Sequence, residues 1–430
     1  MQMRILFSLW ILLVLGRMEA QTLQVNQNRL EKRIVDLSQF GKQANGTTER
    51  VAFSDADIAA REWVITSLGN MGCNVHIDHA GNIIATRPGN NRHAKPIAFG
   101  SHIDRVPNGG DYDGCLGAMA ALEVIEVLNE DKIMTKHPFQ VIVFANEEGG
   151  VMGSRALAGT LGKEALQVVN STGYSMGEGI HRIGGDTTRL HEVKRDTGDL
   201  AAFVELHIEQ GAILYNEKIP IGIVEGIVGL RWWDVTFTGY ANHAGTTPMD
   251  QRQDALLAAA KFIVAVNGIT NSFPGRQVGT VGRISAEPGA PNVIPGSVTV
   301  SLEIRDLSLT TIDKLFMAIK KEGEKIATDS NVGITFKRLD ATADPALTDS
   351  MVQETIAESS KALGLSYKKM QSGAGHDAQD MSRIAPTGMI FVPSKDGISH
   401  SPDEFTSAKD MANGANVLLR TLLRLDQELD

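Results

Sequence analysis

The fold is decided by AFGSHIDRVPNGGDYDGCLGAMAALEVIEVL (residues 98–128) and, after a connector, by PFQVIVFANEEG (138–149). Two apolar runs of strand type, 96–100 and 139–145, flank an amphipathic run of helix type at 117–128. A strand, a helix and a second strand in this order are typical of an α/β sheet, whose ligands bind outside the carboxyl ends of the strands. We therefore predict an α/β fold with a binding site at that rim.

Polar side chains gather directly after both strand-type runs. His102 and Asp104 follow the first run, Glu147 and Glu148 follow the second, and Asp113 lies in the Gly-rich turn before the helix. Imidazole and carboxylate groups without paired cysteines are suited to Zn²⁺ or a similar first-row divalent ion. One such cluster alone is equally well explained as a solvated loop, but clusters at successive strand ends favour a metal site.

Two later strand-type runs also end in histidine. Residues 201–206 precede His207, and residues 388–393 precede His400. A site for two ions needs one bridging carboxylate, with the ions about 3.5–4 Å apart. We interpret Asp113 as the bridge and His400 as the most distant ligand. We assign His102, and either Glu148 or His207, to the individual ions.

The adjacent carboxylates Glu147 and Glu148 can have different roles. On an extended strand end, neighbouring side chains point in opposite directions, so one binds metal while the other faces substrate and water. A metal ion lowers the pKa of the water bound to it to about 7. A carboxylate beside that water is suited to act as general base. Asp104 follows His102 by two residues on the same side of an extended segment, so it is suitably placed to accept a hydrogen bond from that imidazole.

The pattern changes after residue 215. Strand- and helix-type runs follow in the order β-α-β-β-α-β, which is typical of a ferredoxin-like unit. We predict an inserted domain at 216–342 that interrupts a catalytic domain formed by 22–215 and 343–430. The inserted stretch contains His243, Asn292 and Arg305.

The chain as a whole has 430 residues and a formal net charge of −10. The acidic balance, without a block of Lys and Arg, argues against a nucleic-acid surface.

A basic start, MQMR, precedes an apolar run at 5–16 that is too short to span a bilayer. Residues 1–20 therefore resemble a cleaved secretory signal, which predicts a secreted or periplasmic protein; a retained membrane anchor is the alternative. We interpret Cys73 and Cys115 as buried free thiols.

Eight motifs together resemble the hydantoinase/carbamoylase amidase family: GSHID, GGDYDG, NEEG, ELHIEQG, NHAGTTPM, PNVIPG, SGAGHDA and GISHSPDE. This family is the branch of the co-catalytic zinc aminopeptidase-like hydrolases that includes N-carbamoyl-L-amino acid hydrolase, allantoate amidohydrolase and ureidoglycolate amidohydrolase. The resemblance covers nearly the whole chain after the signal. It implies a mixed sheet flanked by helices, with an inserted ferredoxin-like α+β domain through which the protein dimerises.

The resemblance also implies two divalent metal ions per subunit, with Zn²⁺ preferred and Mn, Co or Ni as alternatives. The implied metal ligands are His102, Asp113, Glu148, His207 and His400. The implied catalytic residues are Glu147 as general base, Asp104 as the group that orients His102, and His243. The implied substrate contacts are Gln210, His243, Asn292, Arg305, Gly373 and Gly375. In the family, the dimer brings residues of the His243 and Asn292 type to the active site of the partner.

Three functions compete for these residues. The leading hypothesis is a metal-dependent amidohydrolase that cuts a linear C–N bond of a small ureido acid, such as allantoate, ureidoglycolate or an N-carbamoyl amino acid, and releases ammonia. The alternative enzyme is a di- or aminopeptidase of the same fold, but a set of Arg, Asn, Gln and His suits a carboxylated ureido group better. A binding module would leave Glu147 without a role. We expect a homodimer, no nucleic-acid partner and no stable membrane anchor.

Overall fold

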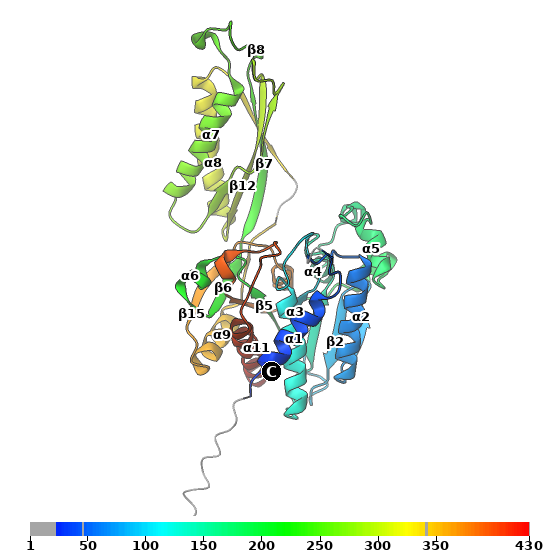
Figure 1. Cartoon of the computed structure of the whole chain (residues 1–430). Coiled ribbons are helices and arrows are strands. Elements are labelled where there is room, and N and C mark those ends of the chain that lie inside the picture. Colours follow the sequence, from blue (N-terminus) through cyan, green and yellow to red (C-terminus); the bar gives the residue numbers. More distant parts are fainter. Residues whose placement is uncertain (1–22, 45–46, 340–342, 430) are drawn as a thin grey trace, which may run out of the picture.

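The computed structural model describes residues 23–44, 47–339 and 343–429 (Figure 1). These residues form two units. The main unit is built around a nine-stranded sheet, and the inserted unit is built around a five-stranded sheet that projects from it. The predicted signal at 1–20 lies outside the described residues.

The nine-stranded sheet has a parallel centre. Strand β3 pairs in parallel with β4 and β5, and β5 pairs in parallel with β16. In order across the sheet the strands are β1 (Asn74–Ile77), β2 (Ile83–Arg87), β4 (Phe139–Phe144), β3 (Ile97–His102), β5 (Ala202–Ile208), β16 (Thr387–Val392), β6 (Ile221–Ile227) and β14 (Ala346–Leu347), with β15 (Tyr367–Ser372) also paired to β6.

Helices cover both faces of this sheet, which explains why its central strands are apolar throughout. Successive side chains of a strand point to opposite faces, so Phe99 and Val141 pack in one core while Ala98 and Ile142 pack in the other. Parallel strands buried on both faces have continuous apolar sequences. The first core includes residues of α1 (Gln27–Ser38), α2 (Asp55–Asn70), α3 (Cys115–Glu130), α9 (Ser350–Ala362) and α11 (Ala408–Glu428). The second includes residues of α4 (Met152–Leu157), α6 (Ile213–Glu217) and α10 (Asp377–Met381), while α5 (Met176–Arg182) packs in a smaller cluster nearby.

The inserted unit has its own sheet and core. Two long helices, α7 (Ala255–Ser272) and α8 (Leu309–Asp329), pack on one face of an antiparallel sheet. The strand order is β10 (Ile284–Glu287), β12 (Ser297–Asp306), β7 (Gly229–Thr238) and β13 (Gly333–Arg338), with β9 (Val278–Thr280) also paired to β12. At the tip, β8 (Asn242–His243) pairs with β11 (Val293–Ile294). This is the predicted ferredoxin-like order of elements.

The start of the inserted unit differs from the prediction. Strand β6 belongs to the nine-stranded sheet, because Ile223 pairs with Ile390 of β16. The five-stranded sheet therefore starts with β7 at Gly229 and not near residue 216. The sequence change after residue 215 marks the strand that leads into the inserted unit rather than the unit itself.

Within the described ranges, one helix, α7, is long and apolar enough to cross a membrane by length and composition alone. Its buried side chains include Ala258, Phe262 and Val266, which pack in the core of the inserted unit against residues such as Val235 and Val300. The apolar character of α7 is thus partly explained by its contact with the sheet.

Candidate metal centre

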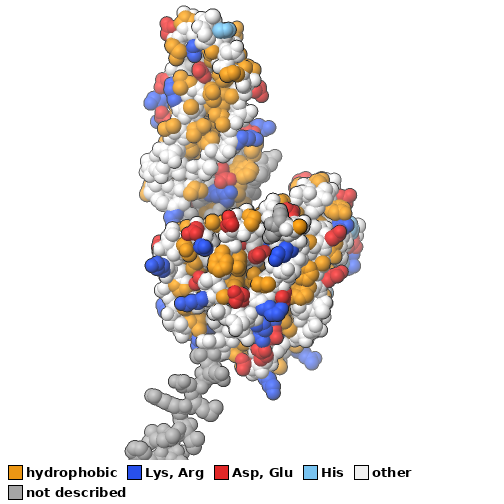
Figure 2. All heavy atoms as spheres, viewed as in Figure 1, with side chains coloured by type: hydrophobic (Ala, Val, Ile, Leu, Met, Phe, Trp, Pro, Cys, Tyr) orange, Lys and Arg blue, Asp and Glu red, His pale blue; other side chains and the backbone are white. Residues whose placement is uncertain are grey.

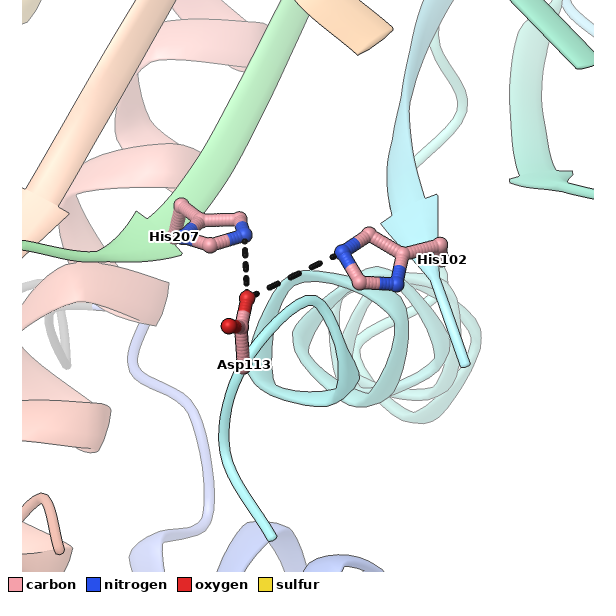
Figure 3. A group of neighbouring side chains, drawn as sticks. All are labelled: His102, Asp113 and His207. Atoms are coloured by element: carbon pink, nitrogen blue, oxygen red, sulfur yellow. Dashed lines mark ion pairs between the residues drawn. The ribbon is translucent and has the colours of Figure 1, made fainter. Parts of the chain in front are cut away.

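Two histidines and one aspartate converge at the carboxyl end of the parallel strands. His102 is the last residue of β3, His207 lies near the end of β5, and Asp113 directly precedes the turn into α3. Asp113 Oδ1 lies 3.1 Å from His207 Nε2 and 3.8 Å from His102 Nε2. Figure 3 shows both imidazoles directed at this carboxylate. All three side chains are buried, so they form a closed group of potential metal ligands.

The other oxygen of Asp113 belongs to a second group. Asp113 Oδ2 lies 3.1 Å from His400 Nε2, and the same nitrogen lies 3.5 Å from Glu148 Oε2. Asp113 therefore presents one oxygen to each group, as a carboxylate shared by two ions would. His400 is half exposed, whereas His102 and His207 are buried, so the second group lies on the solvent side.

Backbone conformations that few residues adopt shape this site. Gly114 has φ +63°, and a Cβ there would lie 2.2 Å from the His102 ring, so only glycine fits between Asp113 and α3. Asn146, Gln210 and His400 have φ of 53°, 56° and 53°, in the left-handed region that is strained for such residues. Strain of this kind concentrates at functional sites.

The nitrogen atoms of the histidines are arranged to bind metal. Nδ1 of His102 lies 3.1 Å from the carbonyl of Asp104, and Nδ1 of His207 lies 2.9 Å from the carbonyl of Ile208. A proton on Nδ1 donates to these carbonyls, so Nε2 is the nitrogen that faces Asp113. Nε2 of His207 also lies 3.2 Å from the backbone nitrogen of Gly114. Among the described residues, the buried Nε2 of His102 has no hydrogen-bond partner, although Asp113 and Glu147 oxygens lie within 4 Å. The donor set therefore fits divalent ions.

The electrostatics of the groups agree with this interpretation. Burial raises the pKa of Asp113, but hydrogen bonds with His207 and His400 outweigh burial and hold that pKa well below its usual value. Burial lowers the pKa of His207, but the bond to Asp113 outweighs it and raises the pKa to about 9. Burial and the charge of Asp113 raise the pKa of Glu148 to about 8. Such concentrated carboxylates are stabilised by cations.

Glu147 lies beside the first group. Its Oε2 is 3.6 Å from His102 Nε2, and its side chain is buried. Burial, and then the charges of Asp377 and Glu148, raise the pKa of Glu147 well above its usual value. A carboxylate with a raised pKa in a metal site is suited to accept a proton and hand it on.

The reason why Glu147 and Glu148 separate differs from the prediction. Strand β4 ends at Phe144, so the two glutamates are not on an extended strand. They follow the left-handed Asn146 in a turn, which directs Glu147 toward His102 and Glu148 toward His400.

Asp104 also acts through contacts that differ from the prediction. The Asp104 carboxylate lies 3.7 Å from His102 Nδ1, which is beyond hydrogen-bond distance. The backbone carbonyl of Asp104 is instead the hydrogen-bond partner of His102 Nδ1. The carboxylate accepts the backbone N–H groups of Glu147 and Glu148, each at 3.2 Å. Asp104 therefore holds the turn of the two glutamates, while its main chain orients His102.

One predicted substrate contact, Gln210, lies at the metal groups, whereas a second, Arg305, contacts the Gly373 segment. Gln210 Nε2 donates to Asp113 Oδ2 at 2.7 Å and lies 3.4 Å from His400 Nε2. Arg305, on β12 of the inserted unit, donates to the carbonyl of Gly373 at 2.7 Å and forms a two-point ion pair with Glu303. Arg305 thereby joins the inserted unit to the Gly373–Gly375 segment, where Gly373 borders open space.

His243 and Asn292 do not join this group. They lie side by side at the tip of the inserted unit, where Val293 pairs with His243 and Ala244 donates to the Asn292 carbonyl. Both are exposed. Figure 1 shows the tip, marked by β8, at the end of the inserted unit farthest from the main sheet.

Several buried polar residues near the centre received no role from the sequence. Glu205 accepts Ser101 Oγ at 2.7 Å and the backbone N–H of Ala378 at 2.9 Å. His376 packs edge-on against His207, with ring centroids 4.4 Å apart. Glu404 accepts the backbone N–H groups of Tyr112 and Asp113. The available signal was their place in the quoted motifs: Glu205 begins ELHIEQG, His376 lies in SGAGHDA and Glu404 ends GISHSPDE.

Fold and site together define a hydrolase with groups suited to divalent ions, and comparison with known proteins narrows this class. Residues 98–424 match the family described as peptidase family M20/M25/M40. The N-carbamoyl-L-amino acid amidohydrolase of Geobacillus stearothermophilus is 41% identical over 408 residues, covering 94% of this chain and 99% of that protein. The ureidoglycolate hydrolase of Arabidopsis thaliana is 36% identical over 418 residues, covering 94% of this chain and 88% of that protein.

A solved structure supports the same family assignment. An amidase of the hydantoinase/carbamoylase family from Burkholderia multivorans superposes with a TM-score of 0.88 at 34% identity, covering 94% of this chain and 99% of that chain. The chain belongs to peptidase family M20/M25/M40, within its hydantoinase/carbamoylase amidase branch. The predicted family, fold class and enzyme class are thereby confirmed.

Proposed function

We propose that this protein is a metal-dependent amidohydrolase that cuts the linear C–N bond of a small ureido acid and releases ammonia. The observation that carries the proposal is the division of the Asp113 carboxylate between two groups of ligands, beside the buried Glu147. The relatives named as N-carbamoyl-L-amino acid amidohydrolase and ureidoglycolate hydrolase support this bond type over a peptide bond. They therefore do not favour the peptidase alternative.

The ligand set proposed for two ions has one shared member and two members on each side. Divalent ions bound there supply Lewis acidity toward water and a carbonyl oxygen. The ligands are His102 and His207 on one side, Glu148 and His400 on the other, and Asp113 between them. Imidazole and carboxylate ligands suit Zn²⁺ first, with Mn, Co or Ni as alternatives.

Glu147 is proposed as the general base. It accepts a proton from the attacking water and delivers it to the leaving nitrogen, for which its raised pKa is suited. Asp104 holds the backbone of Glu147 during this transfer.

Recognition of the substrate is proposed to come from both units. The guanidinium of Arg305 bonds Glu303 and the Gly373 carbonyl in this structure. We propose that its paired donors turn from Glu303 to hold a substrate carboxylate. Gln210 reaches the ligand groups from the main unit. Amide and imidazole side chains match the donors and acceptors of a planar ureido group, and His243 and Asn292 supply such groups.

The position of His243 and Asn292 supports a homodimer. Both side chains are exposed at the tip and lie away from the metal groups of their own chain. Apolar side chains are also exposed on α7 and the edge strand β10, including Leu257, Val264 and Ile284. Figure 2 shows hydrophobic side chains gathered along the inserted unit. We propose that two inserted units associate and that each tip completes the site of the partner subunit.

Mixing inactive variants tests the shared site. Neither His243→Ala nor Glu147→Ala subunits alone should be active, whereas refolded mixtures should regain activity because one of the two sites in a heterodimer contains both native residues. Mixtures as inactive as their parents would reject the shared site.

A substrate panel tests the activity itself. Ammonia release should be measured from allantoate, ureidoglycolate, N-carbamoyl amino acids and, as the control, dipeptides with a ninhydrin readout. We expect turnover of at least one ureido acid and none of the dipeptides; the reverse pattern would establish the peptidase.

Residues 1–20 support export to a periplasm or out of the cell, which fractionation of expressing cells tests.

A further inference from the structure

Glu404 is a buried carboxylate that the proposed ligand set does not use. It lies four residues after His400 in the segment between β16 and α11, and only 4% of its surface is exposed. A buried carboxylate is costly unless its oxygens accept hydrogen bonds. The partners of Glu404 therefore indicate what it holds in place.

Those partners come from the two segments that supply ligands to the second group. Glu404 Oε1 accepts the backbone N–H groups of Tyr112, at 2.9 Å, and of Asp113, at 3.0 Å. Its Oε2 accepts the hydroxyl of Ser399, the residue before His400, at 2.8 Å. One carboxylate thus connects the main chain at Asp113 to the loop that carries His400.

The surrounding packing leaves this carboxylate little freedom. A Cβ on Gly110 would lie 2.2 Å from Glu404 Oε1, so the glycine allows the Asp113 loop to close around the carboxylate. The ring of Tyr112 packs edge-on against Phe405, with centroids 5.7 Å apart. The two segments are consequently held together on both sides of Glu404.

The two ligand groups differ in how much they need such a connection. His102 and His207 are fixed by neighbouring strands of the sheet, because β3 and β5 pair in parallel. His400 instead lies in a loop with φ +53° and is half exposed. Outer residues that orient metal ligands typically change metal affinity by about 10–100-fold when removed.

We propose that Glu404 is a positioning residue that sets the distance between Asp113 and His400, and thereby the affinity of the Asp113–Glu148–His400 group for its ion. The proposal rests on the paired ion site of the proposed function. It predicts an asymmetric effect: loss of Glu404 weakens this ion much more than the ion of the His102–Asp113–His207 group.

Zn²⁺ binding in two single-site backgrounds measures that asymmetry. His102→Ala leaves the second group as the tighter site, and His400→Ala leaves the first. Metal-stripped proteins are titrated with Zn²⁺ against a chromophoric chelator. Adding Glu404→Ala should weaken binding about 10–100-fold in the His102→Ala background and less than about threefold in the His400→Ala background.

Asp426 offers a matched control. It is also a buried carboxylate that accepts two backbone N–H groups, those of Lys136 and His137, but it lies in α11 away from the ligands. Asp426→Ala should leave Zn²⁺ affinity unchanged in both backgrounds. Equal weakening by Glu404→Ala in both backgrounds, or no weakening in either, would overturn the inference.

A second variant applies if Glu404→Ala does not fold. Ser399→Ala removes the loop side of the connection, together with the 3.3 Å contact of its hydroxyl to Asp113 Oδ2, and should still weaken Zn²⁺ binding in the His102→Ala background by about threefold or more. Unchanged affinity would overturn the inference. A wild-type protein that binds fewer than two Zn²⁺ ions would reject the paired site itself. Two ions in the wild type with unchanged affinities in the variants would reject only the role of Glu404.

Discussion

The two sheets of this protein differ in how much of their surface they leave open. The nine-stranded sheet is covered on both faces, and its strands β3, β4, β5 and β16 are buried throughout. The five-stranded sheet is covered by helices on one face, so β7 and β12 alternate between buried and more accessible residues. Buried strands can fix ligand atoms, whereas an open face can present side chains such as Arg305 to another molecule.

This contrast separates chemistry from recognition. The groups that would bind ions and move a proton belong to the main unit, and most are buried. The contacts proposed for the substrate carboxylate and for the partner subunit belong to the inserted unit. Variants of the ligands and of Glu147 in the main unit should therefore reduce metal content or kcat, and variants that remove the proposed carboxylate contact of the inserted unit, Arg305, should act chiefly through KM.

The largest effect is expected for Asp113→Ala, because this carboxylate is shared by both groups. We expect loss of both ions and of detectable activity, measured by elemental analysis of the purified protein and by ammonia release. The matched control is Asp403→Ala, which changes an exposed aspartate near His400 and should retain both ions. Two ions retained without Asp113 would reject its bridging role.

The second-largest effect is expected for Glu147→Gln, which should reduce kcat by roughly 10²–10⁴-fold. The carboxamide has nearly the same shape but cannot accept the proton, so metal content and substrate binding should stay near normal. Steady-state kinetics with elemental analysis separate these effects. A variant with near-normal kcat would remove Glu147 from the mechanism.

Arg305→Ala should have a smaller effect that depends on the substrate. Loss of a charged hydrogen-bonding partner predicts a KM about 10–100-fold higher for carboxylated substrates. An uncharged ureido analogue should be hydrolysed about equally by variant and wild type. The control is Arg283→Ala, because Arg283 also pairs with an acid of the same sheet, Asp234. Equal damage on both substrates would show that Arg305 is structural.

The smallest effect concerns stability and pH in the main unit. In the metal-stripped protein, the pKa is raised to about 8 for Glu148 and to about 9 for His207 and His400. Between pH 6.5 and 8 the folded chain therefore holds protons that the unfolded chain has released, so its stability falls as pH rises. Ion binding needs deprotonated ligands and strengthens over the same range. The difference in Tm between loaded and stripped protein should widen from pH 6.5 to 8, and a constant difference would contradict this.

The convergence of the ligand groups could be predicted because it depends on one regular feature. His102 and His207 follow apolar runs, and the carboxyl ends of parallel strands meet at one edge whatever the details of the loops. The order of elements in the inserted unit was predictable for a similar reason, since hydrophobic periodicity is local.

The rest depends on contacts that local patterns do not encode. The turn that separates Glu147 from Glu148 follows from the left-handed Asn146 and from the carboxylate of Asp104. Glu404 meets Asp113 across a sequence separation of 291 residues. The placement of β6 depends on which strand it pairs with, because its apolar sequence suits either sheet.

The pairing of β6 with β14 has a consequence for the architecture of the chain. Ile227, where the chain leaves the main sheet, is the register partner of Ala346, where it returns. The two ends of the intervening segment are thus neighbours, and that segment has a core of its own. A short turn joining these two positions should preserve the main fold but leave it without activity, because His243 and Arg305 are removed with the segment, while the excised segment should fold alone. The whole segment therefore fits into a single connection between two paired strands of the main sheet.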